Sequence, residues 1–335
     1  MREALAEGKM KGEILRLLKE TNGYLSGQEL CEKFGVSRTA VWKVINQLKE
    51  DGYEIEAVRN KGYALKSVSD VLSREELKSS IETRWAGANV VCFDRTDSTN
   101  IQARKQAEAG APHGTLVVAE RQDGGKGRRG RGWESPSGVG IWMSILLRPQ
   151  ISSLSASMLT LVMALAAEKG IREATGIKSQ IKWPNDLVLN KKKICGILTE
   201  MSTELMEIQH VVIGTGINVN QTEFPPEIAA AATSLNLETG RRFQRSRIIA
   251  ETMKAFEEYY EIFVKTEDMS GLMEEYNKKL VNLGNQVCVL KPSGEFRGIS
   301  EGINKSGGLI VCLPDGTRTE VISGEVSVRG VYGYV

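Results

Sequence analysis

The sequence predicts an α+β protein in three parts: a winged helix-turn-helix, a central mixed β-sheet with helices, and a small β-barrel. Two short amphipathic segments separated by a glycine turn predict the first part. Several β-rich runs between residues 88 and 220 predict the second, because neighbouring runs lack an intervening helix. Closely spaced turn sequences in residues 283–335 predict the third.

The composition is typical of a soluble globular chain. Of the 335 residues, 41% are hydrophobic and 26% are charged, and the net charge of +2 means that nucleic-acid binding would need a local basic patch. The five cysteines are scattered without a CxxC pair, which favours reduced thiols over a disulfide scaffold or a zinc site. No signal peptide is evident, and the apolar run 159–167 is too short to span a bilayer. We therefore expect a cytoplasmic protein that does not bind membranes.

The first domain, expected at residues 1–66, has the pattern of a helix-turn-helix. Ser26 and Glu29 form a capping box for a short helix that Gly35 ends, and Ser37 caps a second helix. The second helix carries an apolar stripe at helical spacing, at Val41, Val44, Ile45 and Leu48. Groups that reach phosphates and base edges lie off this stripe.

A β-hairpin is predicted next, around the turn Asn60-Lys61-Gly62, and it would form a basic wing. The candidate DNA-binding residues are Ser37, Arg38, Thr39, Trp42, Lys43, Asn46, Arg59 and Lys61. The order of cap, turn, recognition face and wing favours DNA binding. A protein-docking module with a solvated basic face is the alternative. Residues 67–75 are expected to be a polar linker, with Ser73 capping the next helix.

The central domain is expected at residues 76–282. Its strand candidates are "NVVCFDRT", "GTLVVAE", "GIWMSILLRP", "SQIKWPN", "DLVLN", "KKICGILTEM" and "IQHVVIGTGINV". Residues 155–175 are expected to form one long helix between them. Since several strands follow one another directly, the sheet should be mixed rather than doubly wound and parallel.

The stretch "GGKGRRGRGWESPSG" at residues 124–138 does not fit the common nucleotide motifs. Its glycines satisfy G-x-G-x-x-G, but Pro136 and Gly138 oppose a following helix, and no acidic residue lies about twenty positions on. A Walker motif is excluded because Gly127, not Ser or Thr, follows the lysine. The two histidines, His113 and His210, are too few for a histidine-rich metal site.

The same stretch fits a flexible clamp for a polyanion. It interleaves four cations with glycines and ends on Trp133; the cations are Lys126, Arg128, Arg129 and Arg131. Opposite charges in contact gain about 4 kcal/mol at an effective dielectric near 20, so four cations suit a triphosphate. Glycines also let backbone N–H groups approach an anion. A solvated loop and a nucleic-acid-binding loop remain alternatives at this point.

Three further motifs identify a family resemblance. "KWPND" at residues 182–186 is followed by Lys193 and Gly196, "DSTN" occupies residues 97–100, and "GTGINVN" occupies residues 214–220. Together with the cationic stretch, this ordered set resembles the biotin–protein ligases over nearly the whole chain. The helix-turn-helix in front resembles their bifunctional members, which also repress the biotin operon.

The resemblance implies a two-step reaction. Biotin reacts with ATP to give biotinyl-5′-adenylate and pyrophosphate. Mg²⁺ would accompany the ATP and would not be held by a cluster of protein ligands. A lysine of the biotin carboxyl carrier protein of acetyl-CoA carboxylase, or of another biotin-dependent carboxylase, then attacks the mixed anhydride. Operator DNA and a second copy of the chain, paired on ligand binding, are the other implied partners.

The resemblance also assigns site residues. Catalysis would depend on Lys193, Arg128 and Lys182. Biotin would contact Ser98, Thr99, Asn100, Gln122, Lys126, Gly127, Arg128 and Lys193. ATP would contact Arg129, Arg131, Trp133, Lys182, Asn185, Asn218 and Arg329. Many family members carry arginine where this chain has Lys126, which loses bidentate geometry. Helix capping by Ser98, and strand-end or turn roles for Lys182 and Asn185, are the alternatives.

The C-terminal domain, expected at residues 283–335, contains the turns "PSGE", "KSGG" and "PDGT". The resembling family has an SH3-like domain here, and a structural cover for the central sheet is an equal alternative. Two other functions stay open for the whole chain: a DNA-binding biotin sensor without catalysis, and a lipoate-type ligase. The charged residues and "KWPND" favour the bifunctional biotin ligase.

Overall fold

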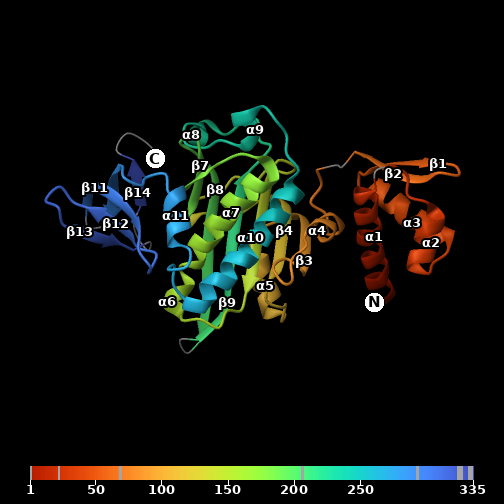
Figure 1. Ribbon diagram of the computed structural model, residues 1–335, viewed down its shortest axis with the longest axis horizontal. Helices are drawn as coiled ribbons and strands as arrows, with labels where there is room; N and C mark the ends of the chain where they lie inside the picture. Colours follow the sequence, from red (N-terminus) through yellow and green to blue (C-terminus); the bar gives the residue numbers. More distant parts are fainter. Residues whose placement is uncertain are drawn as a thin grey trace. The chain divides into compact units, whose positions relative to one another are not determined.

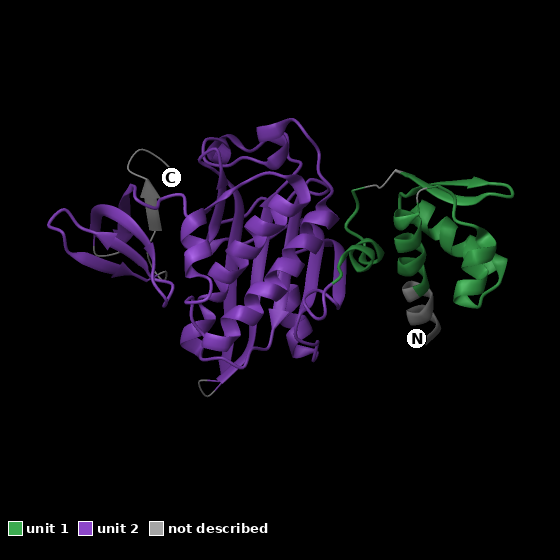
Figure 2. Cartoon of the chain, in the orientation of Figure 1, with its two compact units in different colours: residues 1–82 green, residues 83–335 purple. Residues whose placement is uncertain are grey.

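Two units with separate hydrophobic cores make up the chain, residues 1–82 and residues 83–335 (Figure 2). The computed structural model describes residues 2–335 except 22, 68–69, 205–206, 292–293, 323–326 and 331–334. For residues 2–9, 67 and 327–330 it describes the backbone alone. The first unit ends at Glu82 and therefore includes a helix after the predicted wing.

The first unit is a winged helix-turn-helix, as predicted. Its elements are α1 (Arg2–Glu20), α2 (Gly27–Phe34), α3 (Arg38–Glu50), the hairpin β1 (Glu54–Val58) and β2 (Gly62–Ser67), and α4 (Arg74–Ser80). The predicted capping box is present: the Ser26 hydroxyl accepts from the Gln28 N–H at 3.2 Å and Glu29 accepts from the Ser26 N–H at 3.1 Å. Gly35 ends α2 at φ 63°, and Ser37 caps α3.

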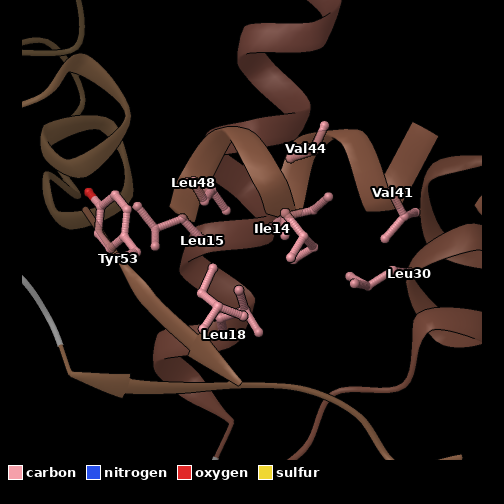
Figure 3. Close-up of a cluster of buried hydrophobic side chains, with 10 residues drawn as sticks. Ile14, Leu15, Leu18, Leu30, Val41, Val44, Leu48 and Tyr53 are labelled. Atoms are coloured by element: carbon pink, nitrogen blue, oxygen red, sulfur yellow. The ribbon is translucent and has the colours of Figure 1, made fainter. Parts of the chain in front are cut away.

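The core of this unit lies between the three helices and the base of the wing. Figure 3 shows Ile14, Leu15 and Leu18 from α1 together with the α2 and α3 side chains and Tyr53. Each of these side chains is almost fully buried. The apolar stripe of α3 therefore faces inward, and its polar side stays at the surface.

The second unit is built on a mixed sheet, as predicted. Within the described residues its strand order is β3-β4-β5-β9-β8-β7-β6, with β3 parallel to β4 and every other pair antiparallel. The strands are β3 (Val90–Thr96), β4 (Thr115–Gln122), β5 (Gly140–Leu147), β6 (Gln180–Lys182), β7 (Asp186–Leu189), β8 (Lys192–Glu204) and β9 (Glu207–Asn218). Each predicted β-rich run overlaps one of these strands.

Helices cover the sheet and fix the ends of its strands. Figure 1 shows α7 (Leu159–Thr175) and α10 (Arg245–Thr266) side by side along the sheet. They cross closely at Gly170, where an added Cβ would lie 2.3 Å from the Thr252 hydroxyl. Helix α5 (Thr99–Glu108) packs Ala103 and Ala107 against the sheet. The short helices α8 (Pro226–Ala229) and α9 (Leu235–Thr239) lie between β9 and α10 in the chain, and α11 (Met273–Lys279) follows α10.

The predicted single helix over residues 155–175 is wrong at its start. Residues Ser153–Ala156 form a separate turn, α6, and α7 begins only at Leu159. Ser152 caps α6 by accepting from the Ser155 N–H at 3.2 Å, so the serine-rich stretch forms its own short helix. Ser153–Thr175 is long and apolar enough to cross a membrane by composition, but 78% of its apolar window is buried inside the protein. Helix α7 within this stretch is a core helix that packs on the sheet.

The C-terminal part is a small antiparallel sheet. Its described strands are β10 (Gln286–Lys291), β11 (Gly294–Ile303), β12 (Leu309–Cys312), β13 (Arg318–Val321) and β14 (Ser327–Gly330), in the order β13-β12-β11-β10-β14. The Trp183 indole N–H of the "KWPND" motif donates to the Gly307 carbonyl at 3.0 Å. That bond ties the motif to this sheet. The side chain of Arg329 lies outside the described residues.

Candidate active site

Residues 124–138 form a hydrogen-bonded hairpin, here called the cationic hairpin. The Gly127 N–H donates to the Arg131 carbonyl at 2.7 Å, and the Trp133 N–H donates to the Gly125 carbonyl at 2.9 Å. The tip is a 3₁₀ turn over Arg128–Gly130, in which Arg129 has a φ of 60°. As predicted, no α-helix follows the glycines, and the dinucleotide motif is excluded.

A buried ion pair holds both ends of the cationic hairpin. Arg245, at the start of α10, is fully buried and donates to the two carboxylate oxygens of Glu120 at 2.8 and 3.1 Å. Glu120 also accepts from the Gly138 N–H at 3.1 Å, and Arg245 donates to the Gly140 carbonyl at 3.1 Å. Because the Arg245 side chain is buried, loss of the Glu120 carboxylate would leave its charge poorly compensated, so these two residues fix where the hairpin leaves and rejoins the sheet.

The predicted biotin residues meet in one small cavity of about 50 Å³, here called the polar pocket. It is lined by Ser98, Thr99, Asn100, Gln122, Lys126, Gly127, Arg128 and Lys193, with Gly196, Gly214 and Gly216 as its floor. Segments far apart in sequence form it, among them the start of α5, the end of β4, the cationic hairpin and strands β5, β8 and β9. Ser98 occupies the N-cap position of α5, but its hydroxyl makes no capping hydrogen bond.

The polar side chains of this pocket are bonded to one another. The Thr99 N–H donates to Gln122 Oε1 at 2.8 Å, and Gln122 Nε2 donates to Ser135 Oγ at 2.9 Å. Ser144 Oγ on β5 lies 2.7 Å from Thr99 Oγ1 and 2.6 Å from Asn100 Oδ1. These hydrogen bonds fix the orientation of the polar groups that line the pocket.

A larger cavity of about 350 Å³ adjoins the polar pocket and is here called the charged cavity. It collects the predicted ATP residues whose side chains are described, namely Arg129, Arg131, Trp133, Lys182, Asn185 and Asn218. The two cavities share Gly127, Arg128, Trp133, Asn185 and Lys193. These shared residues mark the place where a ligand in one cavity would meet a ligand in the other.

Lys193 and Arg128 are held at this boundary. Lys193 Nζ lies 2.7 Å from Asp186 Oδ1 and 5.0 Å from the centre of the Trp133 ring. Arg128 donates to Asn185 Oδ1 at 3.0 Å. Burial lowers the pKa of the Arg128 guanidinium, while the Asp186 carboxylate raises it and Arg129 lowers it. Two cations thus converge at the boundary beside one carboxylate.

Asp186 is a functional candidate to which the sequence analysis gave no role, although it belongs to the "KWPND" motif. It begins β7, one hairpin before Lys193, so the β7–β8 pairing brings the two side chains together. Other lining residues were also missed: Glu134, Phe224, Ile228, Ala231 and Ala232. The segment 231–233 reaches the cavity by pairing with Lys193: its Ala231 carbonyl accepts from the Lys193 N–H at 2.8 Å.

The Trp133 ring lies against two glycines of the sheet. An added Cβ at Gly216 would be 2.5 Å from the ring nitrogen, and one at Gly196 would be 2.8 Å from the ring. The indole N–H is buried and has no acceptor among the described residues. An unpaired buried donor costs about 1–3 kcal/mol, which a ligand acceptor or a movement of the ring would relieve. By contrast, both ends of the Asn218 amide are bonded, to Thr233 and Gln221.

The first unit presents its predicted DNA-binding residues at the surface. Arg38, Thr39, Trp42 and Lys43 are exposed on α3, Ser37 is exposed at its cap, Asn46 is half-buried, and Arg59 and Lys61 are exposed at the wing. Arg38 donates to Gln28 Oε1 at 3.0 Å, and the Lys61 ammonium lies 5.7 Å from the Tyr24 ring centre. A groove between α3 and the wing contains Arg38, Arg59 and Lys61.

Three family models match the chain in the order in which its parts fold. The HTH domain matches residues 12–64, the Biotin/lipoate A/B protein ligase family matches residues 92–218, and the Biotin protein ligase C terminal domain matches residues 283–329. The match to the catalytic family includes the polar pocket, the cationic hairpin and Lys193.

Similar proteins span nearly the same length. The bifunctional ligase/repressor BirA of Bacillus subtilis is 38% identical, covering 92% of this chain and 96% of that protein. The Escherichia coli protein of the same name is 29% identical over 91% of this chain and 92% of that protein. The biotin protein ligase of Aquifex aeolicus in complex with biotin and ATP superposes with a TM-score of 0.64 at 33% identity, covering 72% of this chain and 99% of that one. The chain belongs to the biotin protein ligase family, among its members with an N-terminal helix-turn-helix domain.

Proposed function

We propose that this chain joins biotin to a lysine of a biotin carboxyl carrier protein, at the expense of ATP, and represses transcription in response to biotin. One observation carries the catalytic half: every predicted biotin residue lines the polar pocket, which shares lining residues with a cavity lined by cations. A carboxylate leaving the first cavity would meet a polyphosphate in the second at Arg128 and Lys193. We place the reaction in the cytoplasm.

The polar pocket suits the fused ureido ring of biotin. A ureido group offers two N–H donors and one carbonyl acceptor, so it needs a wall that both accepts and donates. Ser98, Thr99 and Gln122 supply such groups and are buried or half-buried. Hydrogen bonds within the protein hold Thr99 and Gln122, so their side chains would keep one orientation toward the ring.

The cations suit the activation step. A biotin carboxylate oxygen would attack the α-phosphorus of ATP, and pyrophosphate would leave with its Mg²⁺. The two anions repel each other, and Lys193 and Arg128 lie where that repulsion is greatest. Lys182 is 5% exposed in the charged cavity and would stabilise the phosphates. Asp186 would hold the Lys193 ammonium in place until the anions arrive.

The transfer step needs a closed site. The carrier lysine amine would attack the acyl carbon of the mixed anhydride, giving the amide and AMP. Water must be kept from the same carbon, and the cationic hairpin, which lines both cavities, would cover it. Arg329 would approach the nucleotide from the C-terminal sheet.

The direct test is to incubate the protein with biotin, ATP, Mg²⁺ and a candidate apo carrier, and to weigh the carrier by mass spectrometry. The proposal expects one added biotinyl group, and none when the target lysine of the carrier is replaced by arginine. Lipoate in place of biotin tests the lipoate-type alternative. Biotin binding without pyrophosphate release would support a sensor that has lost catalysis, and would contradict ligation.

The repressor half rests on the surface of the first unit. Arg38, Thr39, Trp42 and Lys43 are exposed on α3 next to a basic wing, which suits major-groove docking. Two copies would bind two half-sites at once, so biotinyl-adenylate would act by favouring a dimer. Ligand binding and dimerisation are thermodynamically linked. The adenylate can therefore promote dimerisation only to the extent that it binds the dimer more tightly than the monomer.

Sedimentation and gel shifts on DNA upstream of a biotin synthesis operon test this half. Biotin with ATP should tighten both self-association and DNA binding, and apo carrier should reverse both. DNA affinity that ignores the ligand would make the first unit a constitutive binder. Absence of DNA binding would favour the protein-docking alternative.

A further inference from the structure

Glu200 on β8 does not line the polar pocket, but it contacts Asn100, which does. Its Oε2 accepts from Asn100 Nδ2 at 2.7 Å, and its Oε1 lies 3.6 Å from Arg104 on the surface of α5. Asn100 itself is 5% exposed at the first turn of α5. The carboxylate is therefore placed to fix the orientation of an amide that forms a wall of the pocket.

The direction of each hydrogen bond follows from Glu200. A carboxylate only accepts, so the Asn100 amide must turn its NH₂ group to Glu200 and its oxygen to Ser144. An amide oxygen also only accepts, so the single Ser144 proton is taken by Asn100. Ser144 is fully buried and has no second proton for its neighbour Thr99.

The Thr99 hydroxyl is left with neighbours that can only accept. These are the Ser144 oxygen at 2.7 Å and Gln122 Oε1 at 3.1 Å, and the latter is already oriented by the Thr99 N–H at 2.8 Å. The Thr99 proton is therefore taken by Ser144 or Gln122 and is not available to a ligand. Its oxygen presents lone pairs to the pocket, which suits a ligand N–H.

Close packing restricts the orientation of the Asn100 side-chain amide. An added Cβ at Gly214 would lie 2.2 Å from Asn100 Oδ1, and the NH₂ group also reaches the Leu198 carbonyl at 3.4 Å. Gly214, Ser144 and Leu198 face one another across the β5–β9–β8 ladder. The amide thus has space for one orientation, and Glu200 decides which end points where.

We propose that Glu200 is a positioning residue for ring recognition: through Asn100 and Ser144 it makes Thr99 an acceptor for a ureido N–H. The proposal rests on the proposed biotin ligase function. It assigns Glu200 no contact with biotin and no role toward ATP. Its consequence is selectivity for ligands that offer an N–H donor at Thr99.

A polarity swap tests the proposal. Asn100→Asp puts a second acceptor beside Glu200, so biotin affinity measured by calorimetry without nucleotide should fall by about tenfold or more. Adding Glu200→Gln to that variant supplies a donor to the introduced carboxylate and should recover most of that loss. Glu200→Gln alone keeps an acceptor and should stay within about threefold of the parent.

Two further variants separate positioning from folding. Glu200→Leu removes the acceptor and should weaken biotin about tenfold while leaving the ATP KM and the melting temperature near the parent values. Arg104→Gln removes only the surface partner of Glu200 and should bind biotin like the parent. A double variant no better than Asn100→Asp, or biotin binding unchanged in Glu200→Leu, would overturn the proposal. Failure of the parent protein itself to bind biotin would instead overturn the proposed function.

Discussion

Ser98, Thr99 and Asn100 in the polar pocket are 4%, 3% and 5% exposed, whereas Arg129 and Arg131 in the adjoining charged cavity are exposed to solvent. The pocket side chains bond to one another, while the cations lie on a hairpin whose two ends are anchored by a buried ion pair. A neutral ring is recognised by hydrogen bonds, which depend on the orientation of the donor and acceptor groups in the pocket. A polyphosphate is recognised by charge, which tolerates movement and benefits from closure.

The largest effect should come from the boundary between the two cavities. Lys193→Ala removes a cation from the place where we propose that the two anions meet. The expected cost is about 3–5 kcal/mol, so pyrophosphate release should fall at least a hundredfold. The matched control is Lys192→Ala, which removes the exposed neighbouring lysine and should leave the rate unchanged. A near-parental rate for Lys193→Ala would remove Lys193 from the mechanism.

A smaller effect is expected from the tip of the cationic hairpin. Arg128→Gly deletes a charge and the hydrogen bond to Asn185, so the adenylate should escape before transfer. Bystander lysines in an added unrelated protein should then be biotinylated several-fold more than by the parent. Lys191→Gly, at an exposed position with a positive φ that lines neither cavity, is the matched control. Bystander labelling at the parental level would show that Arg128 does not retain the intermediate.

The smallest effect is expected on stability, from the Asp97 carboxylate that accepts from the Ser98 N–H at the start of the polar pocket. Burial alone would raise the pKa of the Asp97 carboxyl, but hydrogen bonds from the Ser98 N–H, Gln102 and Thr96 bring it below its ordinary value. A lowered pKa stabilises the fold above the unfolded value of about 3.9, and that contribution disappears as pH falls through the folded value.

Asp97→Asn should therefore lose stability at neutral pH only. The carboxylate is largely exposed, so the loss at pH 7 should be at most about 1 kcal/mol. Denaturant unfolding at pH 7 and at about pH 3 measures it, and the difference between parent and variant should shrink at the lower pH. A difference that stays constant between the two pH values would mean that the charge of Asp97 contributes nothing.

Local signals in the sequence predicted much of the fold. The caps at Ser26 and Ser37 depend on side chains two or three residues from the backbone groups that they bond, so they are visible in sequence. The cationic hairpin was visible because charge and glycine are concentrated in it. The break between α6 and α7 was missed because serines at helix-compatible spacing also cap short turns.

Contacts distant in sequence could not be predicted in the same way. Asn100 and Glu200 are a hundred residues apart and meet because α5 packs on β5 and β9, and β9 pairs with β8. Nothing in either local sequence specifies that pairing. The Asp186–Lys193 pair could have been found from the hairpin between β7 and β8, but the bulge between Leu187 and Val188 shifts its register.

One pair of titrations tests the division between the two cavities most directly. Gly214→Ala crowds the Asn100 amide and lines only the polar pocket, while Lys182→Gln removes a cation that lines only the charged cavity. Each variant is titrated calorimetrically with biotin alone and with Mg-ATP alone. Gly214→Ala should weaken biotin about tenfold and leave ATP nearly unchanged, and Lys182→Gln should do the reverse. Equal loss of both ligands in both folded variants would contradict separate recognition of ring and polyphosphate.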